Sequence, residues 1–301
     1  MNSIEAYEKD IEFQLSFLKS FKNQKPLSPN LQKNILFTGS GDSLVSSMLA
    51  ESFSNGIVKA MDPLDLYSNK KLVKSKHVYF VSISGNTITN IKVAKIAKKA
   101  TAITSNPNSK LARVSDEVIL LVSPNNDIFT AGSISFLESA LTCISLVRKI
   151  TIPKNDKLFF KAKSDANKAK ISKRLFILGN MHTYPLAMYC AAKFYEILGY
   201  DAHYCRIEQF SHMELFSSKK GDTVMIFEEK NSHNKQLVKH LQKIGINVIH
   251  PDVPSEKISQ MIYFTFFSQL LSLNEGKKKK KNDCYFVTAD KIRNVSNQMI
   301  Y

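Results

Sequence analysis

Apolar residues at the start of the chain recur every three or four positions. This spacing predicts an amphipathic helix within residues 1–30. Its apolar face is formed by Ile4, Tyr7, Ile11, Leu15, Phe17, Leu18 and Phe21. Pro26 and Pro29 follow, and proline ends a helix because it lacks a backbone N–H donor. We therefore predict an N-terminal helix ahead of the first folded domain.

Short apolar runs then alternate with stretches of helical periodicity. The runs typical of buried strands are Asn34–Thr38, His77–Ile83, Ala100–Thr104 and Glu117–Val122. Helical spacing follows the first run over Leu44–Phe53, and another helix is predicted over Phe129–Arg148. Strands that alternate with helices are typical of a parallel sheet covered by helices, so we predict an α/β fold.

The same pattern begins again in the second half of the chain. Predicted strands there are Arg174–Leu178, Asp222–Phe227 and Ile246–His250, and predicted helices are Pro185–Leu198 and Lys235–Lys243. Gly39 and Gly179 end equivalent strands 140 residues apart, which indicates an internal duplication. We assign 1–30 to the N-terminal helix, 31–150 to the first sub-domain, 151–165 to a linker, 166–276 to the second sub-domain, and 277–301 to a basic loop and C-terminal tail.

Two loops rich in glycine and hydroxyl groups follow neighbouring strands of the first sub-domain. Gly39–Ser43 and Ser82–Thr87 each stand between a strand and a helix. Ligands of open α/β sheets bind at the carboxyl ends of strands, and helix N-termini attract anions. Ordinary helix caps are the alternative for one such loop, but two adjacent loops favour a phosphate site. Glu228–Ser232 corresponds roughly to the second loop, so we expect one phosphate site per chain.

Composition narrows the class of protein. The chain has 301 residues, 44% of them hydrophobic, and a net charge of +16. No apolar run approaches the length of ~20 residues that is needed to span a bilayer. The N-terminus carries acidic residues, where a secretory signal would carry a basic stretch and an apolar core. Lysine outnumbers arginine and is dispersed outside Lys277–Lys281, so we expect a solvated surface and neither a nucleic-acid nor a membrane partner. Four separated cysteines favour a cytoplasmic protein.

The two loops resemble those of the sugar isomerase (SIS) domain family. The duplicated layout is similar to the isomerase part of glucosamine-6-phosphate synthase and to archaeal phosphoglucose/phosphomannose isomerases. The resemblance implies two flavodoxin-like SIS sub-domains and no cofactor. It also implies that the sugar phosphate is held by Ser40, Ser43, Ser82, Ser84 and Thr87, with Gly39 as a possible further contact.

The resemblance also implies a catalytic pair in the second sub-domain. Glu196 matches the family's base, and His212, sixteen residues later, matches the histidine that opens the sugar ring. One carboxylate can move a proton between C1 and C2, and histidine suits ring opening near neutral pH. In the family this histidine acts in the neighbouring subunit's site, so we expect a homodimer with shared active sites. Glu214 completes a His-x-Glu sequence similar to the phosphoglucose/phosphomannose isomerases.

Several residues depart from the family's pattern. The C-terminal Asp290–Asn297 resembles the synthase until its last position, where Asn297 replaces the lysine that forms an imine. Asp127 is similar to an acidic residue of the synthase, and no arginine stands near Thr130–Ser135, where the isomerases place one. The spacing of Cys190, Cys205 and nearby histidines fits no zinc pattern, so we expect no metal site.

The sequence therefore predicts a double-SIS protein that binds a hexose phosphate such as fructose-6-phosphate or glucosamine-6-phosphate. We expect aldose–ketose isomerisation, or amination or deamination as in the glucosamine-6-phosphate synthase and deaminase branch. A phosphoglucose/phosphomannose isomerase is the alternative enzyme. A sugar-phosphate sensor without catalysis is the alternative of another class, and Asn297 favours it.

Overall fold

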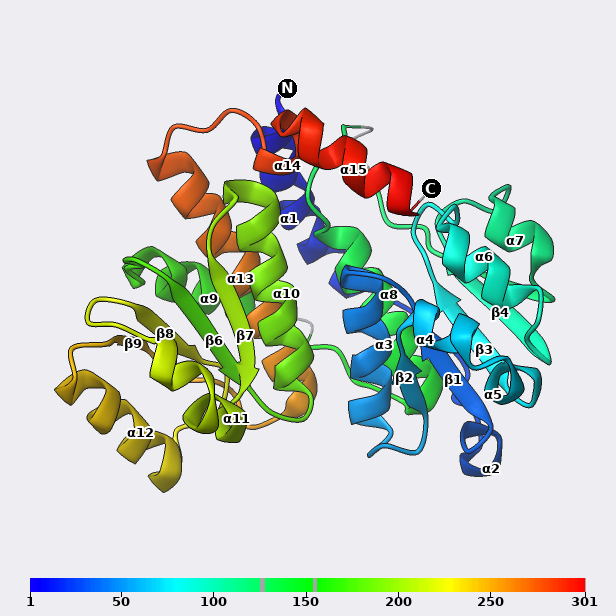
Figure 1. Cartoon of the computed structure of the whole chain (residues 1–301), viewed down its shortest axis with the longest axis horizontal. Coiled ribbons are helices and arrows are strands. Elements are labelled where there is room, and N and C mark those ends of the chain that lie inside the picture. The colour runs from blue at the N-terminus through cyan, green and yellow to red at the C-terminus, as the bar shows by residue number, and fades with distance from the viewer. Residues whose placement is uncertain (125–127, 154–155, 301) are drawn as a thin grey trace. The chain divides into compact units, whose positions relative to one another are not determined.

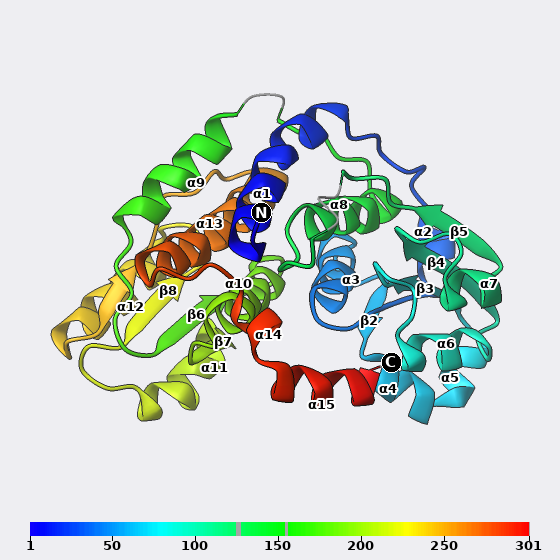
Figure 2. The same cartoon turned by 90° about the horizontal axis from the view of Figure 1, so that it is seen from above.

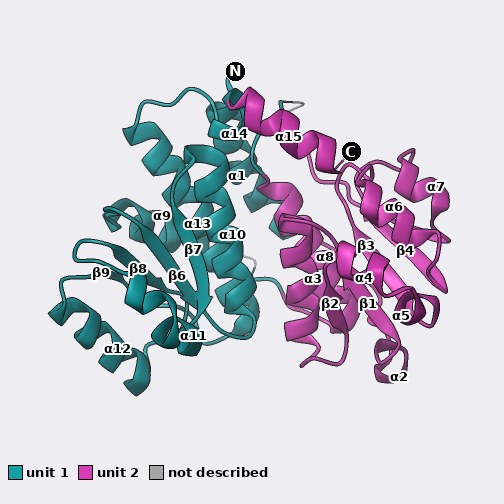
Figure 3. Ribbon diagram, viewed as in Figure 1, with its two compact units in different colours: residues 1–19, 126–131, 152–288 teal, residues 20–125, 132–151, 289–301 magenta. Residues whose placement is uncertain are grey.

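The computed structural model describes residues 1–124, 128–153 and 156–300, which form two compact units. Unit 1 comprises residues 1–19, 126–131 and 152–288, and unit 2 comprises residues 20–125, 132–151 and 289–301 (Figure 3). Each unit contains one of the two predicted sheets. The chain begins in unit 1, builds most of unit 2, returns to build the rest of unit 1, and ends in unit 2 with residues 289–301.

The sheet of unit 2 has five parallel strands in the order β2-β1-β3-β4-β5 (Figure 1). The strands are β1 (Ile35–Thr38), β2 (Lys59–Met61), β3 (His77–Val81), β4 (Lys99–Thr104) and β5 (Glu117–Leu120). The order is that of flavodoxin-like sheets, whose direction of winding reverses between β1 and β3. The sequence did not predict β2, because this edge strand has three residues and Lys59 is exposed.

Helices cover both faces of this sheet (Figure 2). One face carries α3 (Asp42–Phe53) and α8 (Ile134–Val147). The other carries α4 (Pro63–Ser68), α5 (Lys70–Lys74), α6 (Ile88–Ala94) and α7 (Lys110–Val114). The unit also includes α2 (Pro29–Gln32) and α15 (Asp290–Ile300).

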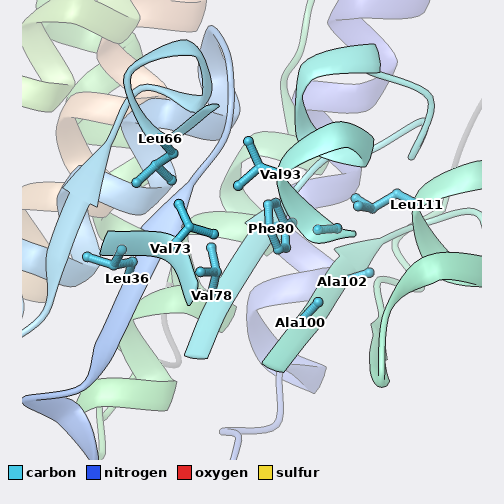
Figure 4. Packing of buried hydrophobic residues seen from close by; sticks show 10 residues of the cluster. Leu36, Leu66, Val73, Val78, Phe80, Val93, Ala100, Ala102 and Leu111 are labelled. Atoms are coloured by element: carbon cyan, nitrogen blue, oxygen red, sulfur yellow. The ribbon is translucent and has the colours of Figure 1, made fainter. Parts of the chain in front are cut away.

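The core beneath α4 to α7 is built from small and branched side chains (Figure 4). Leu36, Val78 and Phe80 point from the sheet toward Leu66 and Val93 of the covering helices, and all five are buried. Burying such side chains contributes about 1.5–3 kcal/mol each, which holds the strands, and therefore the loops at their ends, in place.

The sheet of unit 1 repeats the arrangement with four parallel strands in the order β7-β6-β8-β9. The strands are β6 (Leu175–Gly179), β7 (Ala202–Arg206), β8 (Thr223–Ile226) and β9 (Asn247–Ile249). The predicted α/β fold with two parallel sheets is thereby confirmed. The sequence did not predict β7, an edge strand in which polar and apolar residues mix.

Helices also cover both faces of the sheet in unit 1. One face carries α10 (Thr183–Leu198), α13 (Lys257–Lys278), α9 (Lys157–Lys168) and α1 (Ser3–Ser20). The other carries α11 (Ile207–His212) and α12 (Ser232–Lys243). The short η1 (Glu214–Ser217) and α14 (Tyr285–Thr288) complete the unit. The aromatic run of α13, Tyr263–Phe267, is buried.

The expected linker at 151–165 is wrong for most of its length, because α9 begins at Lys157. Phe159, Ala162 and Ala166 are buried at helical spacing, and Phe159 packs its ring against Phe266 of α13 at 5.2 Å between centroids. The many lysines of α9 hid this apolar face in the sequence. Among the helices that the structure describes, none is long and apolar enough to cross a membrane.

Candidate functional site

The loops that follow β1 and β3 stand side by side, because Thr38 pairs in register with Phe80. Gly39 fixes the first loop against the second strand. A Cβ atom on Gly39 would lie 2.6 Å from the Cβ of Ser43 and 2.8 Å from the carbonyl oxygen of Val81. Only glycine fits there, so the loop after β1 passes directly over the end of β3.

The second loop is held by the start of α7. Gly85 has a φ of +63°, and its carbonyl accepts a hydrogen bond from the N–H of Leu111 at 2.9 Å. A Cβ on Gly85 would lie 2.1 Å from the Oγ of Ser109, the residue that caps α7. The conformation of the loop therefore requires glycine both for its dihedral angle and for its close packing.

The predicted phosphate ligands differ in exposure. Ser40 and Ser84 are exposed, Thr87 is half-buried, and Ser43 and Ser82 are buried. The Oγ of Ser84 accepts a hydrogen bond from the N–H of Asn86 at 3.3 Å, which orders the loop itself. The structure thus brings these serines and Thr87 to one edge of one sheet, at the ends of two neighbouring strands.

The helices that begin at this edge lack side-chain caps. Gly41 precedes α3 and offers no side chain, and the Thr87 side chain makes no capping hydrogen bond to α6. By contrast, Ser28 and Ser109 accept hydrogen bonds from the first turns of α2 and α7. The ordinary-cap alternative therefore fails for α3 and α6. The positive end of the helix dipole at each of these two starts favours an anion.

A buried carboxylate on α8 fixes the end of the same sheet. The two oxygens of Glu138 accept hydrogen bonds from the backbone N–H groups of Val122 and Ser123 at 2.8 and 2.9 Å. Sequence reasoning missed this residue. The signal was present, since a single acid interrupts an otherwise apolar helix. Asp127, which follows this segment, lies outside the described residues.

In unit 1, α10 presents Glu196 together with a lysine that sequence reasoning missed. Lys193 is fully buried, and its Nζ lies 2.5 Å from the Oε2 of Glu196, whose side chain is 32% exposed. The Lys193 ammonium also lies 4.8 Å from the centre of the Tyr189 ring. The spacing of three residues places Lys193 and Glu196 on the same helix face, which is the signal that was available.

A network of amide and hydroxyl groups lies behind this ion pair. Gln269 donates a hydrogen bond to the Tyr189 hydroxyl at 2.8 Å, and Gln14 donates one to Gln269 at 2.8 Å. These residues join α10 to α13 and α1. Since buried polar groups hold fixed positions when their hydrogen bonds are satisfied, the network orients Tyr189 beneath Lys193.

His212 ends α11 and is strongly exposed. Its Nε2 lies 3.1 Å from the Oε1 of Glu208, and its side chain is 68% exposed. Glu214 begins η1 and lies beside the thiol of Cys205. Burial and the nearby Glu214 charge together raise the pKa of this thiol to about 12. The predicted ring-opening histidine is thus on the surface of unit 1, accessible to solvent.

The remaining sequence candidates have the following positions. Asn297 is exposed on α15, which has no buried residue. The basic run is paired: Lys277 contacts Glu8 at 2.5 Å, Lys278 contacts Glu275 at 2.7 Å, and Lys279 lies over the ring of Tyr200. Within the described ranges, no group of three His, Cys, Asp or Glu side chains is placed to hold a metal ion.

Solved structures share this fold over nearly the whole chain. A glucosamine-6-phosphate deaminase from Thermotoga maritima is 17% identical with a TM-score of 0.78, covering 93% of this chain and 96% of that one. The fold is the one predicted from the SIS resemblance. A tagatose-6-phosphate ketose/aldose isomerase from Escherichia coli gives 17% identity, a TM-score of 0.67 and coverage of 93% and 92%.

A third similar structure is the C-terminal domain of glucosamine-fructose-6-phosphate aminotransferase from Francisella tularensis. It is 19% identical with a TM-score of 0.64, and the match covers 91% of this chain and 93% of that one. No protein-family model matches the sequence, and no curated protein sequence matches it. At these identities the likeness establishes the SIS fold alone, and the chemistry has to be argued from the residues.

Proposed function

We propose that this chain binds a hexose phosphate, with the phosphate group at the carboxyl ends of β1 and β3. The observation that carries the proposal is the pair of uncapped helix starts at the point where the winding of the sheet reverses. The positive ends of the α3 and α6 dipoles and the hydroxyls of Ser40, Ser84 and Thr87 suit a phosphate dianion. Structures of similar fold are described as acting on six-carbon sugar phosphates, which supports this ligand class.

The proposed reaction is aldose–ketose isomerisation, or amination or deamination of the bound sugar. Glu196 takes the proton from C2 of the open-chain aldose and returns it to C1, so that the carboxylate is regenerated. Lys193 holds the Glu196 carboxylate in place, because its buried ammonium lies 2.5 Å from the Oε2 of Glu196. In this proposal His212 moves the proton that opens the sugar ring.

Binding and turnover test the two parts of the proposal separately. Ser84→Ala and Thr87→Ala each remove a charge-assisted hydrogen bond, about 1.5–3 kcal/mol, and should weaken the binding of fructose-6-phosphate and glucosamine-6-phosphate. Ser75→Ala is the matched control, an exposed serine of the same unit that bonds only within its own helix end. Unchanged affinity in both loop variants would place the phosphate elsewhere.

Glu196→Gln tests the base, because it keeps the shape of the side chain and removes its basicity. General-base catalysis contributes about 10²–10⁴ in rate, so turnover should fall by that factor while affinity for the sugar phosphate stays nearly constant. A variant that turns over hexose phosphate at the rate of the native protein would contradict the role of Glu196.

Two further functions each have an observation in their favour. The His212-x-Glu214 sequence favours a phosphoglucose/phosphomannose isomerase, which glucose-6-phosphate turnover would identify. Asn297 in place of the family's lysine favours a sugar-phosphate sensor without catalysis. A sensor would show thermal stabilisation by hexose phosphates but no turnover of any of them, and Glu196→Gln would leave its behaviour unchanged.

We also propose that the protein acts as a homodimer. His212 is 68% exposed, and two large apolar side chains near it, Met213 and Phe216, are exposed as well. Exposed apolar groups beside a proposed catalytic residue fit a surface that a second copy covers. A cytoplasmic location agrees with the free thiols of the buried cysteines.

A further inference from the structure

The sheets of the two units align residue by residue at their centres. In unit 2, Thr38 of β1 pairs with Phe80 of β3, and in unit 1, Leu178 of β6 pairs with Ile226 of β8. Counting two residues beyond each pair makes Ser82 equivalent to Glu228. A carboxylate therefore stands at the position where the first copy begins its proposed phosphate loop.

The Glu228 side chain reaches the start of α10. Its Oε1 accepts hydrogen bonds from the backbone N–H of Asn180 at 2.9 Å and from the hydroxyl of Thr183 at 2.6 Å. Asn180 follows Gly179 as Ser40 follows Gly39, and Thr183 lies four residues beyond Gly179 as Ser43 lies beyond Gly39. The two donors therefore correspond to the N–H of Ser40 and the hydroxyl of Ser43 in the first copy.

The backbone beneath these donors is equally tight in both copies. A Cβ on Gly179 would lie 2.6 Å from the carbonyl oxygen of Thr183, as one on Gly39 would lie 2.6 Å from Ser43. Burial raises the pKa of Glu228, while the hydrogen bonds from Thr183 and Asn180 oppose the rise. These are the effects expected when a carboxylate leaves water for a helix N-terminus.

We propose that the second copy retains an anion-binding cradle, and that the carboxylate of Glu228 occupies it as a built-in ligand. The cradle is formed by the N–H of Asn180, in the loop before α10, and by the hydroxyl of Thr183, the first residue of α10. All these contacts lie within unit 1, so the proposal does not depend on the proposed function.

Chemical rescue by a small carboxylate tests the cradle directly. Glu228→Ala removes the internal anion and leaves a space that acetate can enter. We expect the thermal midpoint of Glu228→Ala to fall by roughly 3–8 °C in sodium chloride, since a charge-assisted hydrogen bond to the helix start is lost. Sodium acetate at equal ionic strength should restore the midpoint along a saturation curve.

Glu229→Ala is the matched control. This neighbouring carboxylate accepts a hydrogen bond from the side chain of Gln260 on α13 at 2.6 Å, so acetate should not stabilise the variant beyond the native protein. If Glu228→Ala is unfolded in chloride, the titration is followed as recovery of the native circular dichroism signal. Glu228→Gln should fold and show no acetate effect, because its amide oxygen fills the cradle. Equal stabilisation of Glu228→Ala by acetate and chloride, or no stabilisation, overturns the proposal.

Discussion

Gly85→Ala should destabilise unit 2 through two effects that can be separated. The left-handed backbone at φ +63° costs alanine about 1–2 kcal/mol relative to glycine. The new Cβ would also lie 2.1 Å from the Oγ and 2.4 Å from the Cβ of Ser109, so Ser109 has to move. Its capping hydrogen bond to the N–H of Ala112, 3.2 Å long, is then lost, which costs about 0.5–2 kcal/mol. The total is about 2–4 kcal/mol.

Two variants isolate these contributions. Gly56→Ala changes a glycine at φ +78° with open space around it, the nearest atom being the flexible Lys59 ammonium at 3.7 Å, so only the backbone cost remains. Ser109→Gly removes the obstructing side chain, and glycine is tolerated as an N-cap at a cost of a few tenths of a kcal/mol. The double variant Gly85→Ala/Ser109→Gly should therefore be more stable than Gly85→Ala alone.

Urea unfolding followed by circular dichroism and tyrosine fluorescence measures these differences, since the chain has 11 tyrosines and no tryptophan. The same variants should be titrated with fructose-6-phosphate, because the displaced loop includes Ser84 and Thr87. The reasoning is refuted if Gly85→Ala costs no more than Gly56→Ala, or if Ser109→Gly does not offset part of its cost.

Three further predictions follow from other contacts. Burial acts to raise the pKa of Asp222, but hydrogen bonds from the Lys219 N–H and from Arg174 hold this pKa below its usual range. Asp222→Asn should therefore lower the thermal midpoint at pH 7, and the difference from the native protein should vanish as acid protonates the native carboxyl. A difference that stays constant with pH would contradict this. Phe216→Glu, at a side chain 85% exposed, should convert the proposed dimer to monomer by light scattering without changing the thermal midpoint; an unchanged mass would argue against this surface. Glu138→Ala should cost about 2–4 kcal/mol in urea unfolding, because two buried N–H groups lose their acceptor, and a loss below 1 kcal/mol would show that water replaces it.

The sequence predicted the central strands well because they are buried on both faces. Ile35–Thr38 and Leu175–Gly179 are continuous apolar runs, and each ends at a glycine that the packing requires. The edge strands Lys59–Met61 and Ala202–Arg206 were missed, since the first has only three residues and the second mixes polar and apolar residues. The edge strand Glu117–Leu120 was predicted, because three of its four residues are apolar. Helix α9 was missed because its lysines outnumber its few buried residues.

The site was predicted as a set of loops but not as a set of contacts. The hydroxyl residues of the first copy were found because serine, glycine and threonine cluster after a strand. Lys193 was missed, because a buried lysine in a sequence looks like an exposed one until the ion pair with Glu196 is visible. The bond between Glu228 and Thr183 spans 45 residues, and no local pattern encodes a contact of that range.

The acceptor at each helix start distinguishes the two copies better than their hydroxyl content does. Every helix begins with N–H groups that lack partners within the helix. In α7 the acceptor is the adjacent Ser109, and just before α10 the N–H of Asn180 donates to the distant Glu228. At α3 and α6 no side-chain cap supplies one, although Thr87 stands in the capping position with a suitable hydroxyl. A helix start left without a cap by a residue able to provide it, at the point where the sheet reverses, supports the proposal that a phosphate binds in the first copy.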